Sequence, residues 1–304
     1  MPGMKEIKNH ITSVQETQKI TNAMYLIAST KVQKAKAELD KTKPYFDSLR
    51  TEIKRVFRTV DNVIDGKYFY PDIDDEPLDG TYGYLIITAD KGLAGSYNQT
   101  VIREAELMLR AHPDARVFVV GEYGRRYFRR AGIAIDENFL YTAQDPTLSR
   151  ARDISNYILD LYDKNEIEKI YIIYTDFING ATLESKTTRL LPFHQDYFAP
   201  PKGEKRVEQP FEFSPGPNEL LEYLVPSYIA GFIYSALVDS FCCEQNARMN
   251  AMDSANRNAD EILADLGKQY NYTRQKVITQ EITEIASGAK YQLLKKEERT
   301  NAKG

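Results

Sequence analysis

The sequence is poor in the residues that carry most metal-binding and redox chemistry. Its 304 residues include 2 cysteines and 3 histidines. Cys242 and Cys243 are adjacent, so they make no disulfide framework, and a reducing compartment fits the chain best. His10, His112 and His194 are far apart, and none has a partner at metal-ligand spacing. The composition therefore predicts neither a disulfide scaffold nor a metal site.

An excess of positive charge and a long apolar run are also missing. The formal net charge is -4, whereas general affinity for nucleic acid needs a clearly basic surface. No run of about 18 apolar residues is present, so we expect no membrane span. The opening residues, MPGMKEIKNH, have neither the apolar core of a signal peptide nor the composition of a transit peptide. These absences predict a chain without nucleic-acid partners that is used in a cytosol-like space.

Proline is absent from long stretches at both ends of the chain. None lies within 3–43 or after Pro226. Because proline breaks helix interiors, the ends can form long helices and the middle cannot. About 75 helical residues would span on the order of 110 Å, well beyond a compact domain of this chain length. We expect an N-terminal helix over 1–60, a central domain over 61–217 and a C-terminal helix over 218–304.

Apolar residues at both ends repeat every 3.5 residues, which is the period of a coiled coil. Alternate steps of four and three from Ile7 to Val60 meet an apolar residue at nearly every position. A similar stripe runs from Leu221 to Leu266, with polar members such as Gln245 and Asn256. The two ends most simply pair with each other, antiparallel.

Near the C-terminus the apolar stripe shifts by one residue. Its later members are Ile278, Ile282, Ile285 and Ala289. Such a shift indicates a change of facing partner along the helix. Because the C-terminal helix is the longer one, its tip is expected to be exposed or to enter another protein.

Strand-like and helix-like runs alternate in the middle of the chain. The expected strands are 82–90, 115–121 and 168–177, and the expected helices are 98–112, 122–132 and 149–165. This βαβαβ rhythm predicts a small parallel, Rossmann-like sheet with covering helices. An acidic linker (61–81) leads into it, and a loop-rich return (193–217) leads out. The fold class is therefore α/β, with a long antiparallel coiled coil and a central Rossmann-like domain.

Two stretches invite a chemical interpretation. ADKGLAGSYN (89–98) lies between a strand and a helix, where phosphate loops sit. It matches neither GxGxxG nor GxxxxGK[ST], and Lys91 precedes its glycines instead of following them, so a tight turn is favoured over a nucleotide site. Residues 31–43 are rich in lysine. This pattern is typical of a solvated helix face, or of a surface that contacts an acidic partner.

Several motifs together resemble the gamma subunit family of the F-type ATP synthase. The stretch 7–35 resembles the family's N-terminal helix, including its Gln-Lys-Ile-Thr-x-Ala-Met core. The stretch 242–262 resembles Glu-Gln-x-Ala-Arg-Met-x-Ala-Met, and 278–289 matches Ile-Thr-x-Glu-x-x-acid-x-x-x-Gly-Ala. The turn 89–98 is similar to the family's Asp-Arg-Gly-Leu-Cys-Gly. The departures from the family pattern are Lys91, Ala94 and Tyr291.

The resemblance implies a central-stalk rotor without catalytic residues or cofactors of its own. A left-handed coiled coil would turn inside a ring of alpha and beta subunits, with the α/β domain beside the epsilon subunit and the membrane c-subunit ring. Rotation would couple proton or sodium translocation to ATP synthesis or hydrolysis. The implied location is the cytoplasmic face of a bacterial membrane, as a peripheral part of the complex.

The resemblance also implies contact residues. Positions that engage the beta subunits in the family correspond here to Arg248, Gln275, Thr279 and Glu281. Met24 corresponds to the shaft position nearest the beta subunits' acidic hinge loops, and Lys31 and Lys34 would lie within reach of those loops' charge.

Two other classes of function stay open on the sequence alone. A nucleotide-dependent enzyme on the central domain predicts a phosphate-binding glycine motif and a titratable cluster, and the sequence has neither pattern. A free coiled-coil scaffold predicts an unbroken seam in both helices, but the C-terminal seam shifts and contains polar members.

Overall fold

Two long helices form the ends of the chain in the computed structural model. They are α1 (Met4–Thr59) and α5 (Pro217–Asn301). The structure describes residues 3–59, 68–70, 80–176, 184–194, 198, 214 and 216–301, with side chains as far as Phe57 in α1 and Tyr291 in α5. The two terminal helices are confirmed, while the predicted linkers lie mostly outside the described residues.

The chain divides into two compact units, and α1 and α5 pair in each. The first unit joins Met1–Tyr25 with Met252–Gly304, and the second is Leu26–Ala251. In the first unit, Gln18 Nε2 donates to Asp260 Oδ1 at 2.7 Å. Thr21 in the same unit donates its hydroxyl to the Asn256 side chain. Polar members of the seam thus bond to one another, which favours one register over its neighbours.

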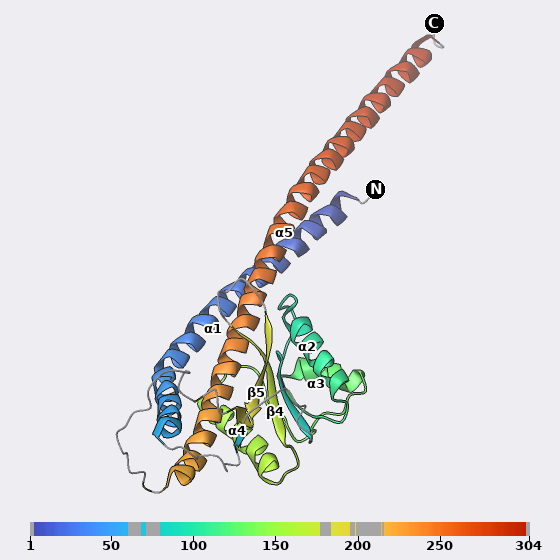
Figure 1. Ribbon diagram of the computed structural model, residues 1–304. Coiled ribbons are helices and arrows are strands. Elements are labelled where there is room, and N and C mark those ends of the chain that lie inside the picture. Colours follow the sequence, from blue (N-terminus) through green and yellow to red (C-terminus); the bar gives the residue numbers. More distant parts are fainter. Residues whose placement is uncertain are drawn as a thin grey trace. The chain divides into compact units, whose positions relative to one another are not determined.

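In the second unit the same two helices pack through aromatic and small residues. Lys31 Nζ lies 5.9 Å from the ring centroid of Phe241, and the rings of Phe46 and Tyr234 are 6.5 Å apart. Residue numbers rise along α1 as their partners fall along α5, so the helices are antiparallel, as predicted (Figure 1). A Cβ added at Gly231 would lie 2.1 Å from Phe46 Cδ1, so only glycine allows this approach.

The 3.5-residue stripes are the buried faces of both helices. Every position of the α1 stripe from Ile7 to Val56 is buried or half-buried, and Val60 lies outside the described residues. The α5 stripe is likewise buried or half-buried from Leu221 to Leu266. The predicted seam is therefore confirmed, because the sequence period places those residues on one side of each helix.

A four-stranded sheet of order β3-β2-β4-β5 lies in the second unit. Its strands are β2 (Tyr82–Ile87), β3 (Arg116–Val120), β4 (Lys169–Thr175) and β5 (Ser185–Leu191). The first three are parallel, as predicted, whereas β5 is antiparallel to β4. The sequence analysis missed β5, because most of it is half-buried and polar (SKTTRLL) and lacks the apolar pattern of a core strand. Two short strands, β1 (Phe69–Tyr70) and β6 (Phe193–His194), pair in parallel.

Helices cover both faces of the sheet (Figure 1). Those in the central domain are α2 (Tyr97–Ala111), α3 (Glu122–Arg130) and α4 (Leu148–Asp163). Side chains alternate along β2. Leu85 and Ile87 join the core that contains α4 and α5, and Tyr84 and Ile86 join the core that contains α2 and α3. The predicted helices are thus present, with ends that differ by at most two residues.

One expectation about hydrophobicity needs correction. Within Pro217–Tyr291, α5 contains an 18-residue window of mean hydropathy 1.3, apolar enough by length and composition to cross a membrane. Polar residues interrupt this window, so it does not stand out as an apolar run in the sequence. The window is 61% buried in the structure, and the core helix of a soluble protein passes the same test.

Candidate functional site

The first candidate site is the edge of the sheet where α/β proteins bind ligands. In open parallel sheets, ligands bind beyond the carboxyl ends of the strands at the point where strand order reverses. Here β3 and β4 lie on opposite sides of β2, so that point lies between β2 and β4. The turn 89–98 follows β2 directly.

A carboxylate of the protein itself occupies the helix N-terminus at this edge. Asp90 Oδ1 accepts the backbone N–H of Glu122 at 3.0 Å. Asp90 Oδ2 accepts the N–H groups of Ala143 at 2.9 Å and Gln144 at 3.0 Å. Glu122 is the first residue of α3, and a phosphate would use such an N-terminus in a nucleotide-binding sheet. The Asp90 side chain therefore takes the place of an anionic ligand at the N-terminus of α3.

Side chains of α5 occupy the rest of this edge. The backbone N–H of Thr175, at the end of β4, donates to Ser240 Oγ at 3.2 Å. Arg248 Nη2 donates to the carbonyl of Gly92 at 3.2 Å. Arg248 Nη1 also pairs with Glu244 Oε1 at 2.6 Å, and the two side chains are only 11% and 4% exposed. The long helix thus covers the ligand edge of the sheet.

Ionisable groups buried on α5, and Tyr97 packed against it, are shifted toward their neutral forms. Burial raises the pKa of Glu244, although Arg248 acts in the opposite direction. Burial, with the Glu244 charge nearby, raises the pKa of Tyr97. Burial also raises the pKa of Cys242 to about 12 and that of Cys243 to about 11. Thiols with such values carry almost no thiolate at neutral pH, so they act as small apolar residues here.

The second candidate site is the end of α5. We call residues 274–291 the tip, and every one of its side chains is exposed. Ile278, Ile282 and Ile285 are 41%, 61% and 73% exposed. The apolar stripe that shifts by one residue is therefore unpaired within the part of the chain that the structure describes, as the sequence predicts.

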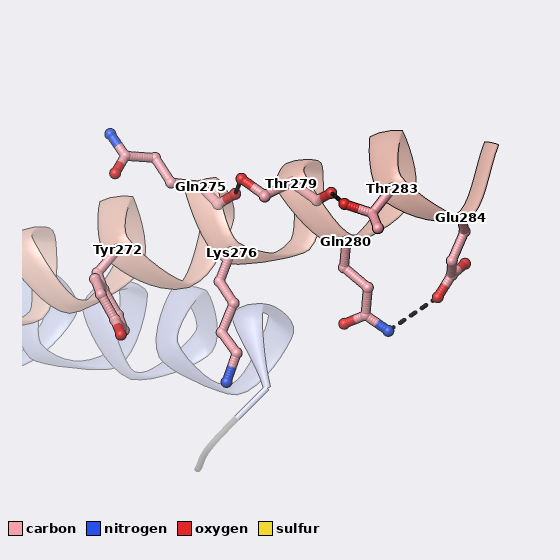
Figure 2. A pocket seen from close by; sticks show the side chains of 7 residues that line it. All are labelled: Tyr272, Gln275, Lys276, Thr279, Gln280, Thr283 and Glu284. Carbon is pink, nitrogen blue, oxygen red and sulfur yellow. Dashed lines mark hydrogen bonds between the residues drawn. The ribbon is translucent and has the colours of Figure 1, made fainter. Parts of the chain in front are cut away.

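Several polar groups of the tip bond to their own helix. Figure 2 shows the hydroxyl of Thr279, which donates to the carbonyl of Gln275 at 2.8 Å, and that of Thr283, which donates to the carbonyl of Thr279 at 2.8 Å. Gln280 Nε2 donates to Glu284 Oε1 at 3.0 Å. These residues line a shallow hollow of about 490 Å³. A surface whose hydroxyls are already satisfied needs no fixed hydrogen bonds from a partner.

The predicted contact residues fall in different environments. Gln275, Thr279 and Glu281 lie on the exposed tip, Lys34 is exposed on α1, and Met24 and Lys31 are half-buried on α1. The structure does not test their contacts with another subunit, so these roles stay predictions.

Arg248 differs from the other predicted contact residues. It is 9% exposed, and it bonds to Gly92 and Glu244 inside the second unit. The sequence analysis missed both partners. The spacing of Glu244 four residues before Arg248 was the available signal for one of them. Its contact with a beta subunit also stays a prediction, although little of its surface is free to make one.

The fold and the two sites define a helical-shaft protein, in which an α/β domain has its ligand edge covered by the longer of two paired helices. The family described as ATP synthase matches residues 3–290. The ATP synthase gamma chain of Ruminiclostridium cellulolyticum is 39% identical over 293 residues, 94% of this chain and 98% of that relative. The sodium ion specific gamma chain of Acetobacterium woodii is 33% identical over 301 residues, 94% of this chain and 98% of the relative.

A solved structure has the same fold. The match comes from the rotor of Euglena gracilis mitochondrial ATP synthase, with a TM-score of 0.63, 14% sequence identity, and coverage of 90% of this chain and 98% of that chain. The chain belongs to the ATP synthase gamma chain family, as the sequence motifs indicate.

Proposed function

We propose that this chain is the central-stalk rotor of an F-type ATP synthase. It turns inside a ring of alpha and beta subunits, and its α/β domain faces the epsilon subunit and the membrane c-subunit ring. The shaft consists of 1–60 and 218–304, and the foot is 61–217. Ion flow through the membrane part drives rotation during synthesis, and ATP hydrolysis reverses it.

The observation that carries this proposal is the exposed tip. A free helix end with Ile282 and Ile285 in water costs solubility unless a partner covers it. The hydroxyls of Thr279 and Thr283 bond to carbonyls of their own helix, so a surrounding sleeve can cover the isoleucines without binding these hydroxyls in one orientation. Weak contacts at every angle are what a bearing needs.

The coupling step requires asymmetry and no catalytic group. A rotor that presents different side chains in different directions shifts the conformational populations of three otherwise equal sites. We assign this role to Met24, Lys31 and Lys34 on α1, and to Gln275, Thr279 and Glu281 on the tip. The chain itself is non-catalytic in this proposal. The covering of the sheet's ligand edge by Arg248 and Glu244 supports that assignment.

The complex lies at the cytoplasmic face of a bacterial membrane in this proposal, and this chain is a peripheral part of it. The proposal holds for either coupling ion, proton or sodium. The ion is chosen in the membrane subunits.

The direct test is rotation. Alpha and beta subunits are assembled with this chain and fixed to a surface, and a bead is attached through an Arg110→Cys substitution. Arg110 has a side chain 77% exposed, whereas Cys242 and Cys243 are buried and should not react. Addition of ATP should turn the bead in one direction. A bead that stays still while the assembly hydrolyses ATP would contradict the proposal.

Truncation and calorimetry separate a bearing from an active site. A chain that ends at Val277 should assemble less tightly and couple less well than one that ends at Tyr291, with ATP hydrolysis less affected. The isolated full chain should bind neither ATP nor NAD at micromolar concentration. A saturable ATP signal that disappears in Gly92→Val would favour a nucleotide-binding enzyme instead. That substitution has room, because an added Cβ meets only Tyr123, at 4.0 Å.

A further inference from the structure

A cavity distinct from the tip and from the sheet edge lies within the second unit. It has a volume of about 340 Å³ and lies between α1, α5 and the segment 145–148 that leads into α4. No residue of the covered sheet edge lines it. Ligand pockets in proteins measure roughly 300–1,000 Å³, so this cavity is large enough for one small molecule.

The floor of the cavity is aromatic. Tyr234 and Phe241 line it from α5, and each is only 3% exposed. They are seven residues apart, so they lie on the same side of the helix. Pro146 and Leu148 add apolar surface from the wall formed by 145–148. A flat or short apolar body would therefore find contacts on more than one side.

The mouth of the cavity carries two ammonium groups from α1. Lys31 and Lys34 both line it, and Lys31 Nζ is 5.9 Å from the centroid of Phe241. Among the described residues, neither lysine has a carboxylate within 4.0 Å. Glu38 also lines the cavity, but its carboxylate pairs with Lys41 at 2.7 Å. The lysines are thus available to an anion.

The wall opposite α1 is held in place by hydrogen bonds. Arg150 Nη1 donates to the carbonyls of Thr142 at 3.3 Å and Asp145 at 3.2 Å. Thr147 caps α4 by accepting the N–H of Arg150 at 3.2 Å. A wall fixed in this way makes the cavity largely pre-formed, which lowers the cost of binding.

We propose that this cavity binds a small amphipathic anion. Its aromatic or short aliphatic body would lie on Tyr234 and Phe241, and its carboxylate, sulfonate or phosphate group would lie between Lys31 and Lys34. Asp145 lines the cavity from the segment before α4, and Glu38 lines it from α1. Because Glu38 is paired with Lys41, the anionic group would lie closest to Lys31 and Lys34. Such a ligand would reduce the repulsion between the two lysines and join α1 and α5 to the segment before α4. This binding site is inferred from the shape and charges of the cavity and does not depend on the proposed rotor function.

Fluorescence titration of the full chain with anilinonaphthalenesulfonate tests the proposal. We expect one saturable site with a dissociation constant on the order of tens of micromolar. The neutral analogue phenylnaphthylamine, which lacks the sulfonate, should bind at least about tenfold more weakly. The double variant Lys31→Gln/Lys34→Gln should also weaken the sulfonate probe by about tenfold.

Two control variants locate the bound probe. Lys19→Gln removes an exposed lysine of the same helix that does not line the cavity, and binding should stay within about twofold. Ile282→Ser/Ile285→Ser removes the exposed apolar residues of the tip and should also leave binding unchanged. Equal losses of affinity in the Lys19 variant and the double lysine variant would show that the effect comes from the general charge of the chain. Binding that disappears with the isoleucines, or no saturable site at all, would overturn the proposal.

Discussion

Between Leu221 and Ala251, α5 is buried or half-buried at nearly every position, whereas between Arg274 and Tyr291 it is exposed at every position. We call the first stretch the base and keep the name tip for the second. Both stretches repeat apolar residues at coiled-coil spacing, so the repeat alone does not tell them apart. The base also holds charges that face protein, such as Glu244 and Arg248. A heptad stripe therefore shows which face of a helix needs a partner, and the neighbouring elements determine whether that partner is in the same chain.

The base should respond very differently from a more exposed part of α5 to the loss of an arginine. Arg248→Met would leave the Glu244 carboxylate buried without its cation, and we expect a loss of about 3–5 kcal/mol in the free energy of unfolding. Burial already raises the pKa of Glu244, so its charged form opposes folding. The loss should therefore be smaller near pH 4, where the carboxyl is protonated, than at pH 8. Urea denaturation at the two pH values measures both effects.

Arg257→Met is the matched control for this prediction. Arg257 pairs with Asp253 at 2.7 Å with the same four-residue spacing, but its side chain is 78% exposed. Exposed pairs contribute about 0–1 kcal/mol, so this variant should lose little. Equal losses at Arg248 and Arg257 would contradict the contrast between buried and exposed charge on α5.

The carboxyl group of Asp239, which lies in the base of α5, should make the free energy of unfolding fall as pH rises. Burial, and the Asp176 charge next, raise the pKa of Asp239 to about 7, against the opposing effect of Lys43, Lys36 and Lys186. A carboxyl group whose pKa is raised by folding does not destabilise the fold at a pH below its pKa in the unfolded chain. Its full destabilising effect is present at a pH above its pKa in the folded chain. Asp239→Asn should therefore be more stable than the wild type by up to about 4 kcal/mol at pH 8, and equal to it near pH 4.

Denaturation curves from pH 4 to pH 8 check this prediction. Asp265→Asn, where the side chain is 71% exposed, controls for the removal of one negative charge. If the stability of Asp239→Asn relative to the wild type is the same at pH 4 and pH 8, the fold does not hold the Asp239 carboxyl group in its neutral form.

Glycines in the base and the tip give the next contrast. Gly231→Ala places a Cβ 2.1 Å from Phe46 Cδ1, so we expect a loss of about 1–3 kcal/mol despite the better helix propensity of alanine. Gly288 on the tip has nothing within 4 Å, so Gly288→Ala should leave stability unchanged or raise it by up to about 1 kcal/mol. Thermal denaturation of the two variants measures the difference. A stabilising Gly231→Ala would show that α1 and α5 pack less closely there.

The smallest change in stability is expected at the apolar residues of the tip. Ile282→Ser/Ile285→Ser should change the free energy of unfolding of the isolated chain by less than about 0.5 kcal/mol, since both side chains are already in water. Val225 in the base is fully buried, and Val225→Ser should cost several times more. Co-purification with alpha and beta subunits should show the opposite order, with the tip variant affected more. A tip variant that assembles normally would argue against a covered bearing.

Much of the fold could be predicted from the spacing of apolar residues in the sequence. The seam from Ile7 to Val56 and the three parallel strands follow from patterns within a few residues of each position, so they could be predicted from the sequence. The strand β5 could not, because Ser185–Leu191 is an edge strand with a mixed pattern that becomes recognisable only once it pairs with β4. The apolar window in α5 was missed for a related reason, since polar residues interrupt it.

The candidate site divides in the same way. The exposure of the tip could be predicted, because a one-residue shift in the stripe and a helix longer than its partner are both properties of the sequence. The roles of Asp90 and Arg248 could not. Asp90 bonds to Glu122 and Gln144, and Arg248 bonds to Gly92, all far away along the chain. By itself, the sequence determined two long helices, their paired faces, the α/β rhythm between them and an unpaired end, because those are local repeats. Only the tertiary structure decided that α5 covers the ligand edge of the sheet and that two lysines share a cavity with two aromatic rings, because these depend on which distant residues meet.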